Sequence, residues 1–235
     1  MKKTVLYVYA MTNDSGLAPC VENGILTLAC CKGGKNGGMR RKAADDLKAK
    51  NDVWILGLCG KRLAGDNANK VYMPVYLAKL SEAVCMKKYY STPEYRKRAD
   101  GRVYEVVNGE LKPTKCNPHN DNECEKDIGG KYVLISENFT YWGDECGKSG
   151  KEIKEAFPYI FESDTDKGKC GIDKHCRGYM VDRNFDEFAE KVCEWKWFLK
   201  DKCNVISKNP ISEKYNYFED ENTDEEKSVS FSCGG

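Results

Sequence analysis

The sequence lacks any long hydrophobic run. No apolar segment approaches the about 18–20 residues that a membrane-spanning helix needs. The opening stretch, MKKTVLYVYAMTN, has an apolar run that stops after about ten residues and contains alternating tyrosines, so it predicts a first strand and not a signal peptide. The chain also lacks the GxxxxGK[ST] pattern of a P-loop and any internal repeat. We therefore expect neither a membrane protein, nor a P-loop nucleotide hydrolase, nor a repeat array.

Cysteine, in contrast, is abundant. Thirteen cysteines make an odd count, and without a predicted signal peptide they argue against a secreted scaffold held by disulfides. Free thiols persist in a reducing compartment. The composition therefore predicts a cytoplasmic protein in which most thiols are free.

The charge is nearly balanced but unevenly distributed. The formal net charge is +1, yet residues 219–227 hold six acids and one lysine, which leaves 37 basic and 31 acidic residues elsewhere, a net of +6. This modest surplus is compatible with an anionic partner. A chain of 235 residues fits one large domain. We predict a single domain over 1–218, with cysteine-rich insertions at about 112–130 and 163–178, followed by a flexible acidic tail over 219–235.

Local patterns predict an α+β fold with at least five strands before one long helix. Asn108-Gly109 predicts a two-residue hairpin turn. Pro74 inside a strand pattern predicts an edge position or a bulge. Strands are predicted at 4–11, 24–31, 53–59, 71–80 and 131–136, and helices at 39–50 and 184–200. This order favours a curled, mixed or mainly antiparallel sheet with peripheral helices over an alternating βαβ arrangement.

Several segments occur together in a characteristic order: YVYAMTNDSGLAPCVENGILTLACCK, MRRKA, NDVWILGLCG, VYMPVYLAKL, YYSTPEYRKR and YVLISENFTYWG. Over roughly residues 4–145 this order resembles the second of the nucleotide modification associated domain families, proteins of phages and bacteria encoded near genes for DNA base hypermodification. The resemblance implies a nucleotide-related role, in the host cytoplasm if the gene is carried by a phage. The chain departs from the family pattern in CCKGGKNGGMRR, where a glycine-rich loop separates Lys32 from Arg40.

A second resemblance concerns the fold. The segment NDVWILGL and the later KVYMPVYLAKL resemble the central strand pair in small barrels of the PUA, ASCH and EVE group. Domains of that group hold a base, often a modified one, in a cleft. This resemblance implies that the sheet curls into a PUA-like partial barrel.

The segment TNDSG after the first predicted strand is the leading candidate for base binding. Asn13, Asp14 and Ser15 offer amide and oxygen groups to a base edge, and Gly16 lets the backbone approach closely. The same residues are also good turn formers, so a plain turn is the competing interpretation.

Cations and aromatic rings complete the predicted site. Lys32, Arg40 and Arg41 flank the glycine-rich loop and are candidate phosphate contacts, against the alternative of a solvated basic surface. Tyr141 and Trp142 crowd a strand end in the segment NFTYWG and are candidates for stacking on a base. Trp54 and Phe139 are the other aromatic candidates, and Trp54 fits the core better.

Two cysteine-rich loops raise the question of a metal. They supply six soft ligands, and zinc needs four in tetrahedral geometry, so a zinc site shared between the loops is one interpretation and free thiols the other. The six residues are Cys116, His119, Cys124, Cys170, His175 and Cys176. Cys31 beside Lys32 is a candidate nucleophile, but both histidines lie outside the resembling segments, so a histidine-assisted cysteine mechanism is not expected.

Three functions follow from these residues. The first is a module that binds a nucleotide, a modified base or nucleic acid in a cleft near TNDSG. The second is an enzyme of nucleotide or base modification, with Asp14 as general base and Lys32 or Arg40 stabilising negative charge. The third is a phage-encoded interaction protein that binds a host defence component. The sequence identifies no cofactor besides the candidate zinc.

Overall fold

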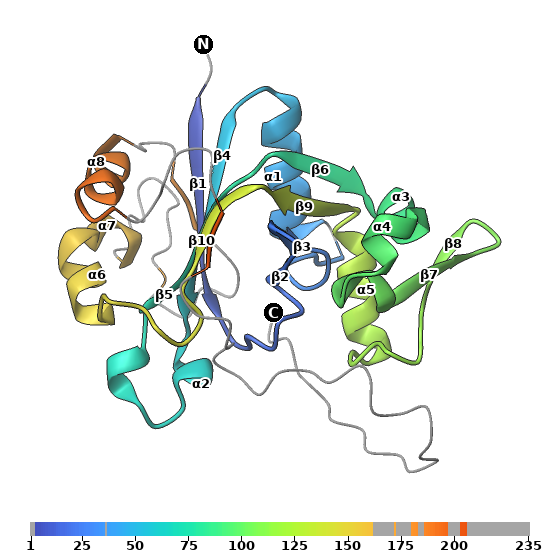
Figure 1. Cartoon of the computed structure of the whole chain (residues 1–235), viewed down its shortest axis with the longest axis horizontal. Helices are drawn as coiled ribbons and strands as arrows, with labels where there is room; N and C mark the ends of the chain where they lie inside the picture. Colours follow the sequence, from blue (N-terminus) through green and yellow to red (C-terminus); the bar gives the residue numbers. More distant parts are fainter. Residues whose placement is uncertain are drawn as a thin grey trace.

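The computed structural model describes residues 3–35, 37–161, 172, 180–182, 186–196 and 203–205. Two β-sheets lie next to each other, and helices cover their outer sides (Figure 1). The fold is therefore α+β, as the sequence predicts. None of the described helices has the length and apolarity that a membrane crossing requires.

The larger sheet has six described strands and mixed direction. Its central strand β4 runs parallel to β1 and antiparallel to β5, while β10 is antiparallel to β5. The order is β11 (Met180–Asp182), β1 (Thr4–Met11), β4 (Asp52–Cys59), β5 (Pro74–Lys79), β10 (Asn138–Tyr141) and β12 (Cys203–Val205). The β-branched and aromatic residues of β1 are buried almost continuously, which is typical of a strand covered on both faces.

The smaller sheet is antiparallel. Its order is β2 (Cys20–Glu22), β3 (Ile25–Leu28), β9 (Tyr132–Ser136) and β6 (Glu82–Cys85). A separate hairpin joins β7 (Tyr104–Val107) to β8 (Glu110–Pro113). Its turn residues Asn108 and Gly109 both have positive φ, 53° and 78°, which confirms the predicted two-residue turn.

Three packed clusters hold these layers together. Side chains such as Tyr7, Leu28 and Ile55 fill the space between the two sheets, together with α1 (Gly38–Lys48). The other face of the larger sheet packs on α6 (Gly150–Ala156), α7 (Pro158–Phe161) and α8 (Asp186–Glu194). The outer side of the smaller sheet carries α3 (Met86–Ser91), α4 (Pro93–Arg96) and α5 (Asp121–Gly129) (Figure 1).

Short helices fill the connections. They are α2 (Lys61–Ala64) and the 3₁₀ turns Ala68–Lys70 and Asp100–Arg102. The sequence places Met39, Ala43, Ala44 and Leu47 on one stripe of the predicted helix. The structure confirms this stripe, because the first three are buried and Leu47 is partly buried against the same cluster. Arg40 is buried with them, and no apolar periodicity indicates that.

The structure excludes one of the two placements predicted for Pro74 and confirms the other. Pro74 begins β5, which lies between β4 and β10, so the edge position is wrong. The alternative of an irregularity is confirmed, because the pairing register of β4 and β5 shifts between Gly57 and Leu58, opposite Pro74. The first residue of a strand is a position where proline is tolerated.

Other predicted boundaries change or lie outside the described residues. The long helix predicted at 184–200 is described as Asp186–Glu194 only, and residues 184–185, residues 197–200 and the acidic tail lie outside the described residues. Within the described part, the two sheets stay open and do not close into a barrel. The polar insertion at 112–130 contains α5, which begins with a capping box between Asn120 and Glu123.

Candidate functional site

The segment 12–20 leads from the end of β1 to the start of β2 and carries a buried carboxylate. Asp14 has no exposed surface. The hydroxyl of Tyr141, at the end of β10, donates to its two carboxylate oxygens at 3.2 and 3.0 Å. Burial, and then the negative charge of Asp14, raise the pKa of Tyr141, so the phenol stays protonated as a donor. The structure thus brings together two predicted site residues that are 127 positions apart.

Two further tyrosines extend this group toward a cation. The hydroxyls of Tyr9 and Tyr76 lie 2.8 Å apart, and burial, the Tyr9 neighbour and the charge of Asp14 raise the pKa of Tyr76. The ammonium of Lys32 lies 4.5 Å from the centroid of the Tyr9 ring, within the range of a cation–π interaction. We call Asp14, Tyr141, Tyr76, Tyr9 and Lys32 the Asp14 cluster.

The residues next to Asp14 differ in their surroundings. Oδ1 of Asn13 is a buried acceptor without a hydrogen-bond partner among the described residues. Ser15 is buried. Gly16 has φ +85°, and no atom lies within 4 Å of the position that a Cβ would take. The segment therefore combines a buried carboxylate, an unsatisfied amide oxygen and open space at its glycine.

A buried ion pair fixes the far end of the segment. The guanidinium of Arg98 donates to the carbonyls of Cys20 and Glu22 at 3.0 and 2.8 Å. Its Nε lies 3.4 Å from Oδ1 of Asp100, and both side chains are almost fully buried. Asp100 also accepts hydrogen bonds from Thr27 and, at 3.0 Å, from the Tyr89 hydroxyl. These contacts hold the start of β2, and with it the end of the segment, in one conformation.

The three predicted phosphate contacts lie in different environments. Lys32 belongs to the Asp14 cluster. Arg40 has no exposed surface and donates to the main-chain carbonyls of Ala29 at 2.5 Å, of Tyr132 at 2.8 Å, and of Asp127. Arg41 is exposed on α1. The described contacts of Arg40 thus join three main-chain segments, while its neighbour faces solvent.

The predicted aromatic candidates divide between the faces of the larger sheet. Tyr141 and Phe139 pack in the cluster between the sheets. Trp142, 6% exposed, packs with the apolar residues under α6 and α7 on the opposite face, because successive side chains of a strand alternate in direction. Trp54 is partly buried on that same face. Among the described contacts of these four rings, the hydrogen bond to Asp14 comes from Tyr141.

The predicted metal ligands are not gathered around a common point. Among the described residues, no group of three histidine, cysteine, aspartate or glutamate side chains is placed to hold a metal ion. Sγ of Cys124 lies 3.6 Å from the main-chain carbonyl of His119, and neither Cys124 nor Cys116 forms a disulfide among the described residues. Cys170, His175 and Cys176 lie outside the described residues.

His119 has different partners, which the sequence did not indicate. Its Nε2 lies 3.9 Å from Sγ of Cys31, and its Nδ1 lies 2.8 Å from Oδ2 of Asp127. Burial lowers the pKa of His119, but the hydrogen bonds with Asp127 and Cys31 outweigh burial and raise it to about 11. The sequence offers no reason to expect a histidine beside a cysteine, whereas the structure places His119 in contact with Cys31. The pair is 88 positions apart in the chain, so no local motif reveals it.

Comparison with known proteins adds one finding. The family model described as nucleotide modification associated domain 2 matches residues 3–174. This match includes the segment with His119 and Asp127, which lies between two of the motifs that carry the resemblance. No curated protein matches the sequence, and no solved structure matches it.

Proposed function

The chain belongs to the nucleotide modification associated domain 2 family, and from this premise we propose that it binds a nucleotide or nucleobase at the Asp14 cluster. The observation that carries the proposal is Oδ1 of Asn13, a buried acceptor that no described residue satisfies. A buried polar group without a partner costs about 1–3 kcal/mol. A donor on a ligand, such as the exocyclic amine or ring N–H of a base, would remove that cost.

The neighbouring carboxylate supports the same ligand chemistry. The two Asp14 oxygens accept from the Tyr141 hydroxyl, and a carboxylate offers about four lone-pair sites in all. Asp14 and Asn13 then read donors along one base edge, while Tyr141 holds the carboxylate in place. At Gly16 there is room for a ring to approach the backbone.

Lys32 supplies the charge complement for a phosphate. Its ammonium is positioned over Tyr9, inside the same cluster. A lysine of this kind acts on phosphate as a point charge. Arg41, exposed at the start of α1, is the second candidate for a phosphate or a nucleic-acid backbone. Binding of an oligonucleotide through these cations weakens as salt rises.

The test is a calorimetric titration with a nucleoside, its monophosphate and oligonucleotides with and without modified bases. We expect Asp14→Asn to weaken every ligand at least about tenfold, equivalent to 1.4 kcal/mol. Asp45→Asn, a change of an exposed carboxylate on α1, is the matched control and should bind like the wild type. The proposal would be refuted if the protein bound none of these ligands, or if Asp14→Asn bound them with wild-type affinity.

A second variant separates the base from the phosphate. Lys32→Met keeps an aliphatic chain beside Tyr9 but removes the ammonium. We expect it to weaken the monophosphate and to leave the affinity for the nucleoside within about twofold, since one charge contact is lost. An equal loss for both ligands would show that Lys32 acts by holding the loop and not by contacting phosphate.

A further inference from the structure

A second group of reactive side chains lies at the loop that joins β3 to α1 and carries both Cys31 and Lys32. Cys31, His119 and Asp127 come from the loop before α1, the loop before α5 and α5 itself. Sγ of Cys31 lies 3.9 Å from Nε2 of His119, and Nδ1 of His119 lies 2.8 Å from Oδ2 of Asp127. The thiol thus contacts the histidine ring, and the ring contacts the carboxylate. This is the arrangement of a catalytic triad, which is recognised by the roles of its residues and their distances and not by their order in the chain.

The surrounding contacts fix this geometry. The other carboxylate oxygen of Asp127 accepts the main-chain N–H of Cys31 at 2.6 Å, and the Tyr104 hydroxyl donates to Oδ2 at 3.2 Å. The His119 and Asp127 side chains are 3% and 4% exposed. Asp127 thus orients both the histidine ring and the backbone that carries the thiol, which is the role of a positioning residue.

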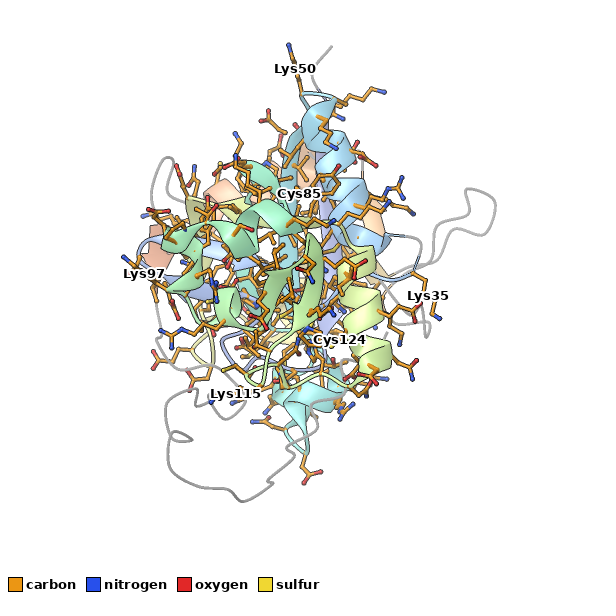
Figure 2. All side chains as sticks on the ribbon, turned by 90° about the vertical axis from the view of Figure 1, so that its right-hand side faces the viewer. Lys35, Lys50, Cys85, Lys97, Lys115 and Cys124 are labelled. Carbon is orange, nitrogen blue, oxygen red and sulfur yellow. The ribbon has the colours of Figure 1, made fainter. Side chains whose placement is uncertain are left out.

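The loop is docked on α5 at several points. The N–H of Gly34 donates to the carbonyl of Lys126 at 2.7 Å, and the ammonium of Lys35 lies 3.0 Å from a carboxylate oxygen of Glu125. Figure 2 shows Lys35 at the side of α5, the helix that also carries Cys124. Cys31 and Lys32 both have positive φ, 61° and 50°. Such backbone angles are unfavourable for residues with side chains, and they concentrate at functional sites.

The thiol itself remains reachable. Cys31 is half-buried, whereas Cys20, Cys30 and Cys59 are buried. Its partner His119 is almost fully buried behind it. A reachable nucleophile beside a base that a third group orients is the signature of covalent catalysis.

We propose that Cys31, His119 and Asp127 form a covalent acyl-transfer site that takes an acyl group from an ester or amide. In the resting pair the proton of Cys31 is held on Nε2 of His119, and the thiolate sulfur forms a bond to the carbonyl carbon. The bond from that carbon to the leaving oxygen or nitrogen breaks, and the leaving group takes the proton from His119. The product is a thioester on Cys31, which water cleaves to the free acid, restoring the thiol.

The proposal goes beyond nucleotide binding, because the three residues do not include Asp14, Asn13 or Lys32. Its test uses two small probes that need no base: iodoacetamide for nucleophilicity and p-nitrophenyl acetate as the ester. Site-resolved mass spectrometry of the full chain, in a buffer with a chelator, gives a rate for each cysteine. Cys85, an exposed thiol at the end of β6 and away from α5 (Figure 2), is the reference within the same molecule.

We expect Cys31 to be alkylated at neutral pH faster than Cys85 and to accumulate an acetyl thioester that Cys31→Ser lacks. His119→Asn keeps an N–H donor near Asp127 but removes Nε2. It should slow both reactions at Cys31 by about 100-fold, the range of general-base assistance, and leave Cys85 unchanged. Equal rates at the two thiols, or an unchanged rate at Cys31 in His119→Asn, would overturn the proposal.

Two measurements distinguish a loss of thiol reactivity from a loss of folded structure in His119→Asn. The urea midpoint of His119→Asn shows whether the fold is retained. The ultraviolet absorbance of the thiolate is independent of probe access: it should be present in the wild type at neutral pH and reduced in both Cys31→Ser and His119→Asn. Absorbance that is identical in the three proteins, with the fold retained, would also overturn the proposal.

Discussion

Arg40 and Arg41 are adjacent in sequence and equal in charge, but the structure predicts opposite effects when they are replaced. Arg40 is fully buried and donates to three main-chain carbonyls. Arg41 is exposed on the same helix. Replacing each with methionine, which has a similar length and no charge, measures what the buried guanidinium contributes.

The magnitude follows from the partners that lose their donor. In Arg40→Met the carbonyls of Ala29, Asp127 and Tyr132 lose a buried hydrogen bond, at about 1–3 kcal/mol for each stranded group. Methionine fills part of the volume, and hydrogen bonds of one network are not additive. We therefore expect a loss of roughly 3–6 kcal/mol, a large part of the about 5–15 kcal/mol that stabilises a typical domain. Arg41→Met should change stability by less than about 0.5 kcal/mol.

The assay is urea unfolding followed by tryptophan fluorescence, with the free energy of unfolding obtained by linear extrapolation. Arg40→Lys is the informative intermediate, because a single ammonium lacks the planar fork that reaches several acceptors at once. It should fall between the wild type and Arg40→Met. If Arg40→Met were as stable as the wild type while losing affinity for a nucleotide, Arg40 would be a ligand contact and the reasoning from its carbonyl partners would be refuted.

Three further predictions concern the groups around the two sites. Burial lowers the pKa of His119, but the hydrogen bonds of its ring, first that with Asp127, raise the pKa to about 11. The stability that His119 contributes is fully present below the unfolded pKa of about 6.5 and is lost as the pH rises toward 11. His119→Asn should therefore flatten the decline of the unfolding free energy above neutral pH. Asn120→Ala removes the cap of α5 and should cost about 1 kcal/mol and slow alkylation of the thiol that α5 supports. Gly57→Ala places a Cβ 2.3 Å from the Tyr76 ring; it should cost about 1–3 kcal/mol and change the near-ultraviolet circular dichroism of the tyrosines.

Each of these predictions has an outcome that would contradict it. For the first, that outcome is an unfolding free energy that falls as steeply at alkaline pH in His119→Asn as in the wild type. Asn122→Ala alters an exposed residue of α5 and should leave both stability and the thiol rate unchanged, so an equal effect of the two asparagine changes would contradict the second. Gly147→Ala adds a methyl group where no atom lies within 4 Å. If it cost as much as Gly57→Ala, steric contact with Tyr76 would not be the cause.

Local chemistry in the sequence accounts for much of the fold. The first strand, the α1 stripe and the Asn108-Gly109 turn depend on near neighbours, and the structure contains all three. Alternation along a strand also explains why Tyr141 and Trp142, adjacent in sequence, face different clusters. Which of the two faces Asp14 depends on the pairing of β10 with β5, and that is a long-range property.

The candidate sites show where local reasoning ends. The spacing of Cys116, His119 and Cys124 suits a metal, but α5 begins at Asp121 and aims the Cys124 thiol at a main-chain carbonyl. The described partners of His119 are Asp127, eight residues further on in α5, and the distant Cys31. Arg40 and Arg41 have identical side chains, but Arg40 is buried where main-chain carbonyls of three other segments accept its hydrogen bonds. Those carbonyls come from distant parts of the chain, so the local sequence does not distinguish the two arginines.

The two left-handed residues of the loop have one more consequence. A single peptide unit joins Cys31, whose sulfur faces His119, to Lys32, whose ammonium rests on Tyr9. A rotation of this peptide unit would therefore reorient the Cys31 thiol and the stem of the Lys32 side chain together.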